Sequence, residues 1–348
     1  ISPYSYEFLL FTDKILHSLS ANLQTINTGS FQKNSKILKF LKVYKRTSPI
    51  TDTEIDRWSA LYPTNPKLPE IASKRLPFHF FGQENPFSII NPELSASTVD
   101  IWLKIASVLK IPEDHLMIIA VKNTVLKYLK QHFSPHIVLH HDVKFVDMID
   151  KMISKVKEPE SSVACASWVA NQMPSGGNKV AFASMAVDYA QQWYDQSAAP
   201  VIDVYKKLVC FKQQSAVENA LHKNNLASDE ILSLKQSPSQ LIEHLIEELS
   251  LDIGQCVKAC KAISEISDII QPEIDLIKVI MKFILKWLNV TKGNTAASNL
   301  DESFFPLSPV NREWEDDDTD DRNLHRIINF LLSLPQSLFE NLFKVLQS

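Results

Sequence analysis

Apolar residues recur every three or four positions along most of the chain, the spacing that places side chains on one face of an α-helix. The first stripe covers Phe8–Leu23 and the second covers Ile37–Tyr44. Strong stripes resume over Val99–Leu288, and a closing pair covers residues 324–346. The pattern predicts about fifteen helices joined mostly by short connections.

Local signals mark where some of these helices begin and end. Thr51-Asp52-Thr53-Glu54 has the form of a capping box, in which the Thr hydroxyl and the Glu carboxylate satisfy free amides at a helix start. We expect this helix to carry Trp58 and to end at Tyr62-Pro63, because proline cannot continue a helix. Ser237-Pro238-Ser239-Gln240 repeats the signal, with proline at the first helical position.

The character of the sequence changes between Pro63 and Pro92, where 30 residues include six prolines. Each proline removes an amide donor, so a regular helix cannot run through this stretch. The segment Arg75–Phe81 nevertheless contains three phenylalanines, which are expected to leave water. We therefore expect an ordered, proline-rich connection over residues 63–97 that is pinned against the helices.

The expected fold class is all-α. No fixed sequence period appears, so the named helical repeats find no support. Successive amphipathic helices pack as antiparallel pairs, and stacked pairs form a solenoid, so we expect an irregular α-solenoid. Five parts are predicted: N-terminal helices (1–62), the proline-rich connection (63–97), a central helical solenoid (98–289), a polar and acidic flexible loop (290–322) and a C-terminal helical pair (323–348).

The amino-acid composition disfavours several classes of protein. Only six of 348 residues are glycine, far below the usual ~7%. This disfavours an all-β fold, a dinucleotide-binding domain, a P-loop NTPase or a kinase, all of which draw on glycine. The net charge is −4, and the run Glu313–Asp321 holds seven acidic residues, so the remainder is near neutral and no nucleic-acid partner is expected. Four cysteines do not form a disulfide framework, and no apolar run reaches the ~18 residues of a membrane span, so no membrane insertion is expected.

A cluster of histidines is the basis for the one enzymatic function that we consider as an alternative. His132, His136 and His140 recur every four residues, with His141-Asp142 adjoining, a set that a metal-dependent hydrolase would need. Pro135 interrupts the helix that would align them, so exposed or capping histidines are the preferred interpretation. We expect no catalytic residue, no metal and no cofactor.

Two more features of the sequence remain as candidates. Cys256 and Cys260, one helical turn apart, fit buried small apolar residues better than a redox pair. Ser175-Gly176-Gly177-Asn178-Lys179 fits a turn between helices better than a phosphate loop.

Three candidate interaction sites stay open between a structural and a functional interpretation. The segment with Arg75, Phe78, His79, Phe80 and Phe81 is either a plug between helical layers or a partner-binding hot spot, since arginine and aromatic residues dominate such sites. Trp314 lies within the acidic run, which is either a solvated loop or a dock for a basic surface. Ser308 precedes a proline and is a candidate for proline-directed phosphorylation.

Four short motifs carry a family resemblance: Phe40–Arg46, Arg75–His79, Asn85–Leu94 and Ile105–Leu109. Together they resemble the C-terminal region of the Rough deal (Rod) family, over about 70 residues. Phe87 stands where that family often has tryptophan. The Sec39-like tethering subunits of the endoplasmic reticulum, including NBAS, share the same general pattern, so this related family stays open.

The resemblance implies a non-catalytic scaffold segment of the Rod–Zwilch–Zeste-white ten complex. Its implied partners are Zwilch and Zeste-white ten, with a homodimer formed through the parent complex and dynein–dynactin recruited indirectly. Its implied roles are kinetochore corona assembly and spindle assembly checkpoint signalling. Its implied location is the cytoplasm and nucleus, and the kinetochore and spindle in mitosis. The Sec39-like alternative implies a vesicle-tethering subunit in Golgi-to-endoplasmic-reticulum transport.

Overall fold

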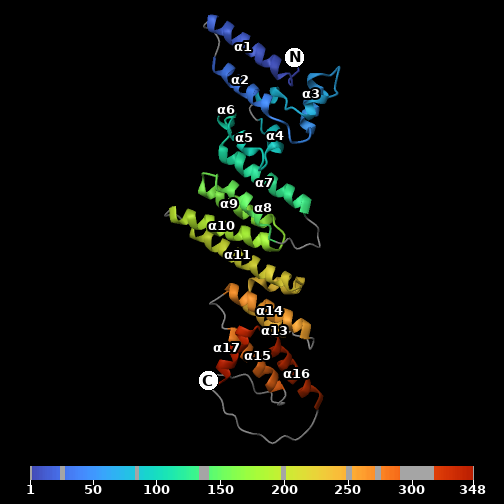
Figure 1. The fold of residues 1–348 in the computed structure, drawn as a ribbon, viewed down its shortest axis with the longest axis vertical. Helices are drawn as coiled ribbons and strands as arrows, with labels where there is room; N and C mark the ends of the chain where they lie inside the picture. Colours follow the sequence, from blue (N-terminus) through green and yellow to red (C-terminus); the bar gives the residue numbers. More distant parts are fainter. Residues whose placement is uncertain are drawn as a thin grey trace. The chain divides into compact units, whose positions relative to one another are not determined.

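The computed structural model describes residues 2–23, 28–82, 86–132, 141–196, 201–247, 253–270, 276–290 and 317–347. Within these ranges the chain forms 17 α-helices and four short 3₁₀-helices, and no described segment is a β-strand (Figure 1). Helices pack mainly on their neighbours in the sequence. The prediction of an all-α, irregular solenoid-like fold is confirmed.

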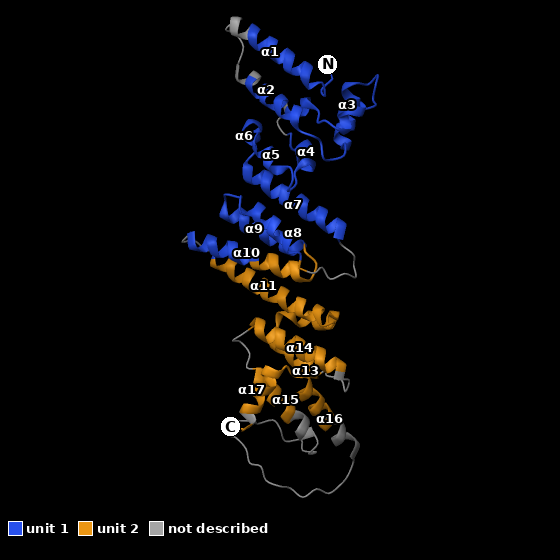
Figure 2. Cartoon of the chain, viewed as in Figure 1, with its two compact units in different colours: residues 1–137, 142–172, 185–201 blue, residues 138–141, 173–184, 202–348 orange. Residues whose placement is uncertain are grey.

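The chain divides into two compact units (Figure 2). Unit 1 comprises residues 1–137, 142–172 and 185–201, and unit 2 comprises residues 138–141, 173–184 and 202–348. Each unit has its own packing and is described by itself. The five-part division made from the sequence stays a prediction.

Unit 1 consists of long and short helical elements that pack on their neighbours. α1 packs against α2, and α7 packs against α5, α8 and α9. Its elements, ending with a helix whose first residues belong to unit 2, are α1 (Tyr6–Leu23), α2 (Thr28–Val43), α3 (Asp52–Leu61), η1 (Glu70–Ser73), η2 (Phe78–Gly82), α4 (Phe87–Ile90), η3 (Asn91–Glu93), α5 (Val99–Leu103), α6 (Ala106–Leu109), α7 (Glu113–His132), α8 (Val143–Ile153), α9 (Pro159–Gln172) and α10 (Gly177–Gln196).

Unit 2 is organised around α14, which packs against α11, α13 and α16. Its core joins aliphatic side chains from all of these helices, including the fully buried Leu241, Ile242 and Ile266. Its elements are α11 (Ile202–Lys223), α12 (Asp229–Ser233), η4 (Leu234–Gln236), α13 (Pro238–Glu247), α14 (Ile253–Ile270), α15 (Leu276–Val290), α16 (Asp317–Ser333) and α17 (Gln336–Gln347).

The predicted start and stop of α3 are confirmed. The Thr51 side chain accepts a hydrogen bond from the Glu54 amide, and the Glu54 carboxylate accepts one from the Thr51 amide, so the capping box is complete. The C-cap is Tyr62, immediately before Pro63. α16 begins at Asp317, inside the acidic run and earlier than the predicted Leu324. Acidic residues suit a helix start because the positive end of the helix dipole lies there.

The first apolar stripe does form one helix, but it does not become core. Phe8, Phe11, Ile15 and Leu19 on α1 remain 44–59% exposed, whereas Tyr6 on the same helix is fully buried. α1 packs on α2 with its other side. Periodicity places residues on one face, and only the neighbouring elements decide whether that face is covered.

The turn between α9 and α10 matches its sequence prediction. Gly176 has a φ of 147°, a conformation that residues with a Cβ rarely adopt. A Cβ on Gly177 would lie 2.8 Å from the Cβ of His141, so this glycine is required by close approach. Lys179 pairs with the carboxylate of Glu218, at 3.1 Å, and this negative charge opposes phosphate binding. Among the described helices none is long and apolar enough to cross a membrane.

Candidate functional site

The proline-rich connection is held against the start of the chain. The Phe78 amide donates to the Pro3 carbonyl at 3.0 Å, and the Tyr6 hydroxyl donates to the Leu76 carbonyl. Arg75 donates to the Tyr4 carbonyl at 3.1 Å. Because these bonds join residues about 70 positions apart, the described parts of the connection are ordered by tertiary contacts and not by helical propensity.

The predicted hot spot lies on η2 and the turn before it, and its members differ in exposure. Phe80 and Phe81 are each 1% exposed, and Phe81 stacks on Trp102 with ring centroids 6.2 Å apart. Phe78 and His79 are half-buried. The Arg75 side chain is 29% exposed and pairs with Glu7 at 3.2 Å. Phe80 and Phe81 therefore occupy plug positions, and only the remaining three residues reach the surface.

His79 has an unusual environment for a polar side chain. Both of its ring nitrogens are buried without a hydrogen-bond partner, and its ring lies 4.4 Å from that of Phe80. Burial and the nearby positive charge of Arg57 lower its pKa, so the neutral imidazole is favoured. Arg57 itself stacks over the Phe80 ring at 4.7 Å.

Beneath this segment lies a buried polar cluster built around Arg46. Arg46 Nη1 donates to Glu54 Oε1 at 2.8 Å, and Arg46 Nε lies 3.8 Å from Glu93 Oε1. The three side chains are no more than 1% exposed. The cluster therefore buries one positive and two negative charges, and it needs further hydrogen bonds to be stable.

Those hydrogen bonds converge on Glu93 at the end of η3. The hydroxyl of Tyr44 donates at 2.6 Å, and the amides of Thr47 and Ser48 donate at 2.8 and 3.0 Å. The Thr47 and Ser48 hydroxyls donate as well. Burial raises the pKa of Glu93, but the hydrogen bonds from Ser48, Tyr44 and Thr47 outweigh it and hold the pKa below its ordinary value. The chemistry of this site is structural, because every polar atom of the carboxylate is occupied.

The motifs that carry the family resemblance meet in this one region. Phe40 and Tyr44 of the first motif contact Trp102, with ring centroids 4.9 and 5.0 Å apart. Phe81 lies on the same indole, and Glu93 of the third motif binds Tyr44. Sequence reasoning missed the roles of Arg46 and Glu93. Glu93 could have been noticed as the one charged residue of the motif Asn85–Leu94, whereas Arg46 follows two lysines in its motif and does not stand out.

Several of the other predicted site residues lie outside the part of the chain that the structure describes. Trp314 and Ser308 lie outside the described residues, so their roles stay predictions. His136 and His140 also lie outside them. His132 is exposed and its ring stacks on Tyr128, while Asp142 accepts the Phe145 amide as the N-cap of α8. No group of three His, Cys, Asp or Glu side chains in the described part of the chain is placed to hold a metal ion.

The cysteines behave as small buried residues where they were predicted to. Cys256 and Cys260 are fully buried on α14. Burial raises the pKa of the Cys260 thiol to about 12, and the neighbouring Cys256 adds to this effect. Burial likewise raises the pKa of Cys165 to about 11. Thiols with such pKa values stay protonated at neutral pH and are poor nucleophiles.

Comparison with known proteins identifies relatives of most of the chain. The family model for the Rough deal protein C-terminal region matches residues 66–348. Human Kinetochore-associated protein 1 is 28% identical over 314 residues, which cover 83% of this chain and 14% of the human protein. The mouse protein of the same name is 26% identical over an alignment 358 residues long, gaps included, which covers 96% of this chain and 15% of the mouse protein. The chain thus spans about one seventh of the length of these curated relatives. Because the family match covers well over half of its residues, the chain belongs to the Rough deal family and corresponds to its C-terminal region.

Proposed function

We propose that this chain is a non-catalytic scaffold segment of a kinetochore protein. The observation that carries the proposal is the Rough deal family match over residues 66–348, together with the name that the human and mouse relatives share. The segment acts at kinetochores in mitosis and resides in the cytoplasm and nucleus. The finer proposal is that it works within the Rod–Zwilch–Zeste-white ten complex, binds Zwilch and Zeste-white ten, and forms a homodimer through that complex.

Physical features support a scaffold over an enzyme. The buried charges of Arg46, Glu54 and Glu93 satisfy one another, so this cluster is suited to holding the fold together. Helices packed on their neighbours leave faces and grooves for other proteins, as in solenoids generally. In the proposal, these surfaces support corona assembly and checkpoint signalling, and they recruit dynein–dynactin indirectly.

The test is to express the tagged chain in dividing cells arrested without spindle attachment. We expect it to localise to kinetochores and to co-purify with Zwilch and Zeste-white ten, and crosslinks will map the contacts. Localisation to Golgi or endoplasmic-reticulum membranes would instead support the Sec39-like alternative, which the family match disfavours. Absence from both locations, with the chain folded, would refute the scaffold proposal.

The partly exposed edge of the proline-rich connection is the proposed partner contact, formed by Arg75, Phe78 and His79. Phe78→Ala tests it. Lost complex assembly with unchanged stability supports a partner contact, whereas a stability loss of about 3 kcal/mol or more supports a plug. Val43→Ala is the matched control in the same unit, because Val43 is 82% exposed and lies outside this edge.

A further inference from the structure

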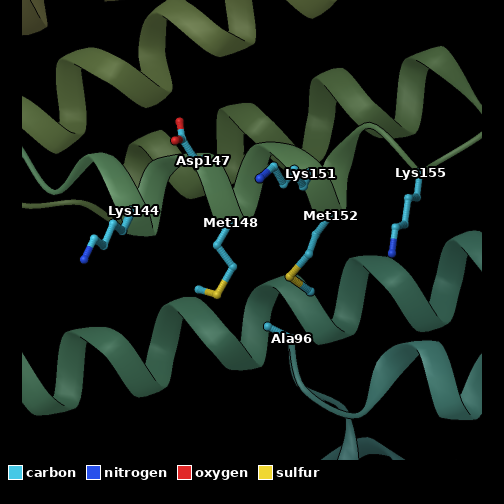
Figure 3. Close-up of a pocket in the computed structure, with 7 residues that line it drawn as sticks. All are labelled: Ala96, Lys144, Asp147, Met148, Lys151, Met152 and Lys155. Atoms are coloured by element: carbon cyan, nitrogen blue, oxygen red, sulfur yellow. The ribbon is translucent and has the colours of Figure 1, made fainter.

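A groove in unit 1 combines lysines with methionines. It runs beside α8 and has a volume of about 410 Å³. Lys144, Met148 and Lys151 follow the i, i+4, i+7 spacing of one face of α8, and Lys155 lies two residues beyond the end of this helix. Figure 3 shows Met148 and Met152 pointing toward the space above Ala96, with Lys144 and Lys155 at its two ends, while Asp147 points away from it.

The opposite wall of the groove is fixed in place. The Ala96 amide donates to Thr124 Oγ1 on α7 at 3.0 Å, and the Ser95 amide donates to Thr98 Oγ1 at 3.0 Å. On the α8 side, Met152 is 5% exposed, whereas Met148 is half-buried. The groove therefore has a rigid wall and an apolar floor in which one thioether remains accessible.

The rim of the groove is positively charged. Lys144 and Lys151 are exposed and have no ion-pair partner among the described residues. Lys155 pairs with Asp100 at 2.8 Å, but both side chains are about half exposed or more, so water screens this pair. A ligand with carboxylates spaced along one face would find two unpaired ammonium groups beside the methionines.

We propose that this groove binds an acidic amphipathic helix of a partner protein. An apolar side chain of this helix would pack on the accessible Met148, since an unbranched thioether adapts to varied shapes. Glutamates beside it would pair with Lys144 and Lys151. This inference goes beyond the proposed function, because it does not depend on which complex the chain joins.

The chemistry of the groove disfavours two other ligands. Nucleic acids are bound most specifically by arginine forks on the phosphates and by aromatic side chains stacked on the bases, and the groove lining has neither arginine nor aromatic residues. Membrane surfaces are bound by a convex helix that buries its own apolar face, whereas here the methionines lie in a concavity with lysines above them.

The test uses the 348-residue chain and a fluorescent synthetic helical peptide with Leu at i and i+4 and Glu beside each Leu. A peptide with Gln in place of Glu is its control. We expect the acidic peptide to bind and the Gln peptide to bind at least ~10-fold more weakly, because two charge pairs are lost. The double variant Lys144→Glu/Lys151→Glu should weaken acidic-peptide binding by at least the same factor.

Matched variants separate the groove from net charge. Lys206→Glu/Lys207→Glu on α11 makes the same charge change at exposed positions of the other unit and should leave binding unchanged. Met148→Ser should weaken binding without any change in charge. The proposal is overturned if the acidic peptide does not bind, if both double variants weaken it equally, or if phosphatidylserine vesicles or duplex DNA bind through Lys144 and Lys151 while the peptide does not.

Discussion

Arg46 links several of the described N-terminal elements through one side chain. It lies between the carboxylates of Glu54 and Glu93, and it also donates to the Ala72 carbonyl at 3.0 Å. One guanidinium thus joins α3, η1 and η3. A fork of five fixed donors suits this task, and lysine could not bind so many groups at once. Removing one partner of a buried pair is costly, because the other charge stays buried.

We expect Glu93→Gln to lower the free energy of unfolding of this region by about 3 kcal/mol, because the amide presents donors where Tyr44 and Ser48 also donate. Denaturant-dependent hydrogen exchange of peptides from α2 and α3 will measure it. Glu7→Gln is the control: its pair with Arg75 is exposed and should change stability by less than about 1 kcal/mol. Equal effects from both variants would contradict a structural role for the cluster.

The lowered pKa of Glu93 also predicts an acid dependence. A carboxyl group whose pKa is lower in the folded state stabilises the fold above its unfolded pKa, which is near 4.5. That stabilisation is lost as the pH falls from 4.5 through the folded pKa. Hydrogen-exchange protection of α2 and α3 should therefore decrease below about pH 4.5 in the wild-type chain and decrease less steeply in Glu93→Gln. Parallel pH profiles would refute this.

At the scale of elements, the helices and the proline-rich connection obtain their conformation differently. α3 starts at a capping box that four consecutive residues encode. η2 has no such local code; it is positioned by the Phe78–Pro3 hydrogen bond and by aromatic contacts with Trp102. Each periodic segment could therefore be predicted as a helix by itself. For the proline-rich connection, the sequence predicted that it is ordered but not which conformation it adopts.

Phe81→Ala tests the plug. Phe81 is 1% exposed and contacts Trp102, so its removal leaves a cavity and should cost about 3–5 kcal/mol. Urea unfolding followed by tryptophan fluorescence will report it, because Trp102 lies at the site. Val43→Ala should change stability by less than about 0.5 kcal/mol. A loss for Phe81→Ala no larger than that of the control would show that η2 does not seal the core.

At the scale of the whole molecule, the described helices build a hydrophobic core in each of the two units. The core around α14 lies entirely in unit 2 and includes Leu245, which is 3% exposed. The aromatic core around Trp102 lies in unit 1. Fold class was predictable because helical stripes build the core around α14 and supply Tyr44 and Trp102 to the aromatic core, to which the proline-rich connection adds Phe81. The grouping into two units was not, since it depends on which distant residues meet.

Leu245→Ala probes this organisation. It should lower hydrogen-exchange protection in α13 and α14 by about 2–5 kcal/mol, because helical stacks transmit stability mainly between neighbours. Protection in α7, within unit 1, should stay unchanged. Equal losses in α7 and α14 would mean that the chain unfolds as one cooperative body.

Some features of the candidate sites could be predicted from the sequence, and others appear only in the tertiary structure. Arg75–Phe81 was recognisable from composition, because arginine and aromatic residues stand out in a proline-rich stretch. The composition did not show which of these residues are buried. Consecutive side chains of a 3₁₀ turn point in several directions, so Phe80 and Phe81 are buried while Phe78 and His79 reach the surface. The lysines and methionines of α8 were overlooked, because the apolar stripe on its other face dominated the pattern.

By itself, the sequence determined most of the longer helices, several of their caps and the resemblance to the family, because helical spacing, capping residues and short motifs are local properties of the chain. Tertiary structure alone decided that the α1 stripe stays exposed, that Arg46 and Glu93 share a buried cluster, and that α8 borders a basic groove. Each of these depends on which distant segment covers a given face. Burial and charge pairing are properties of the space between elements, and no local pattern encodes that space.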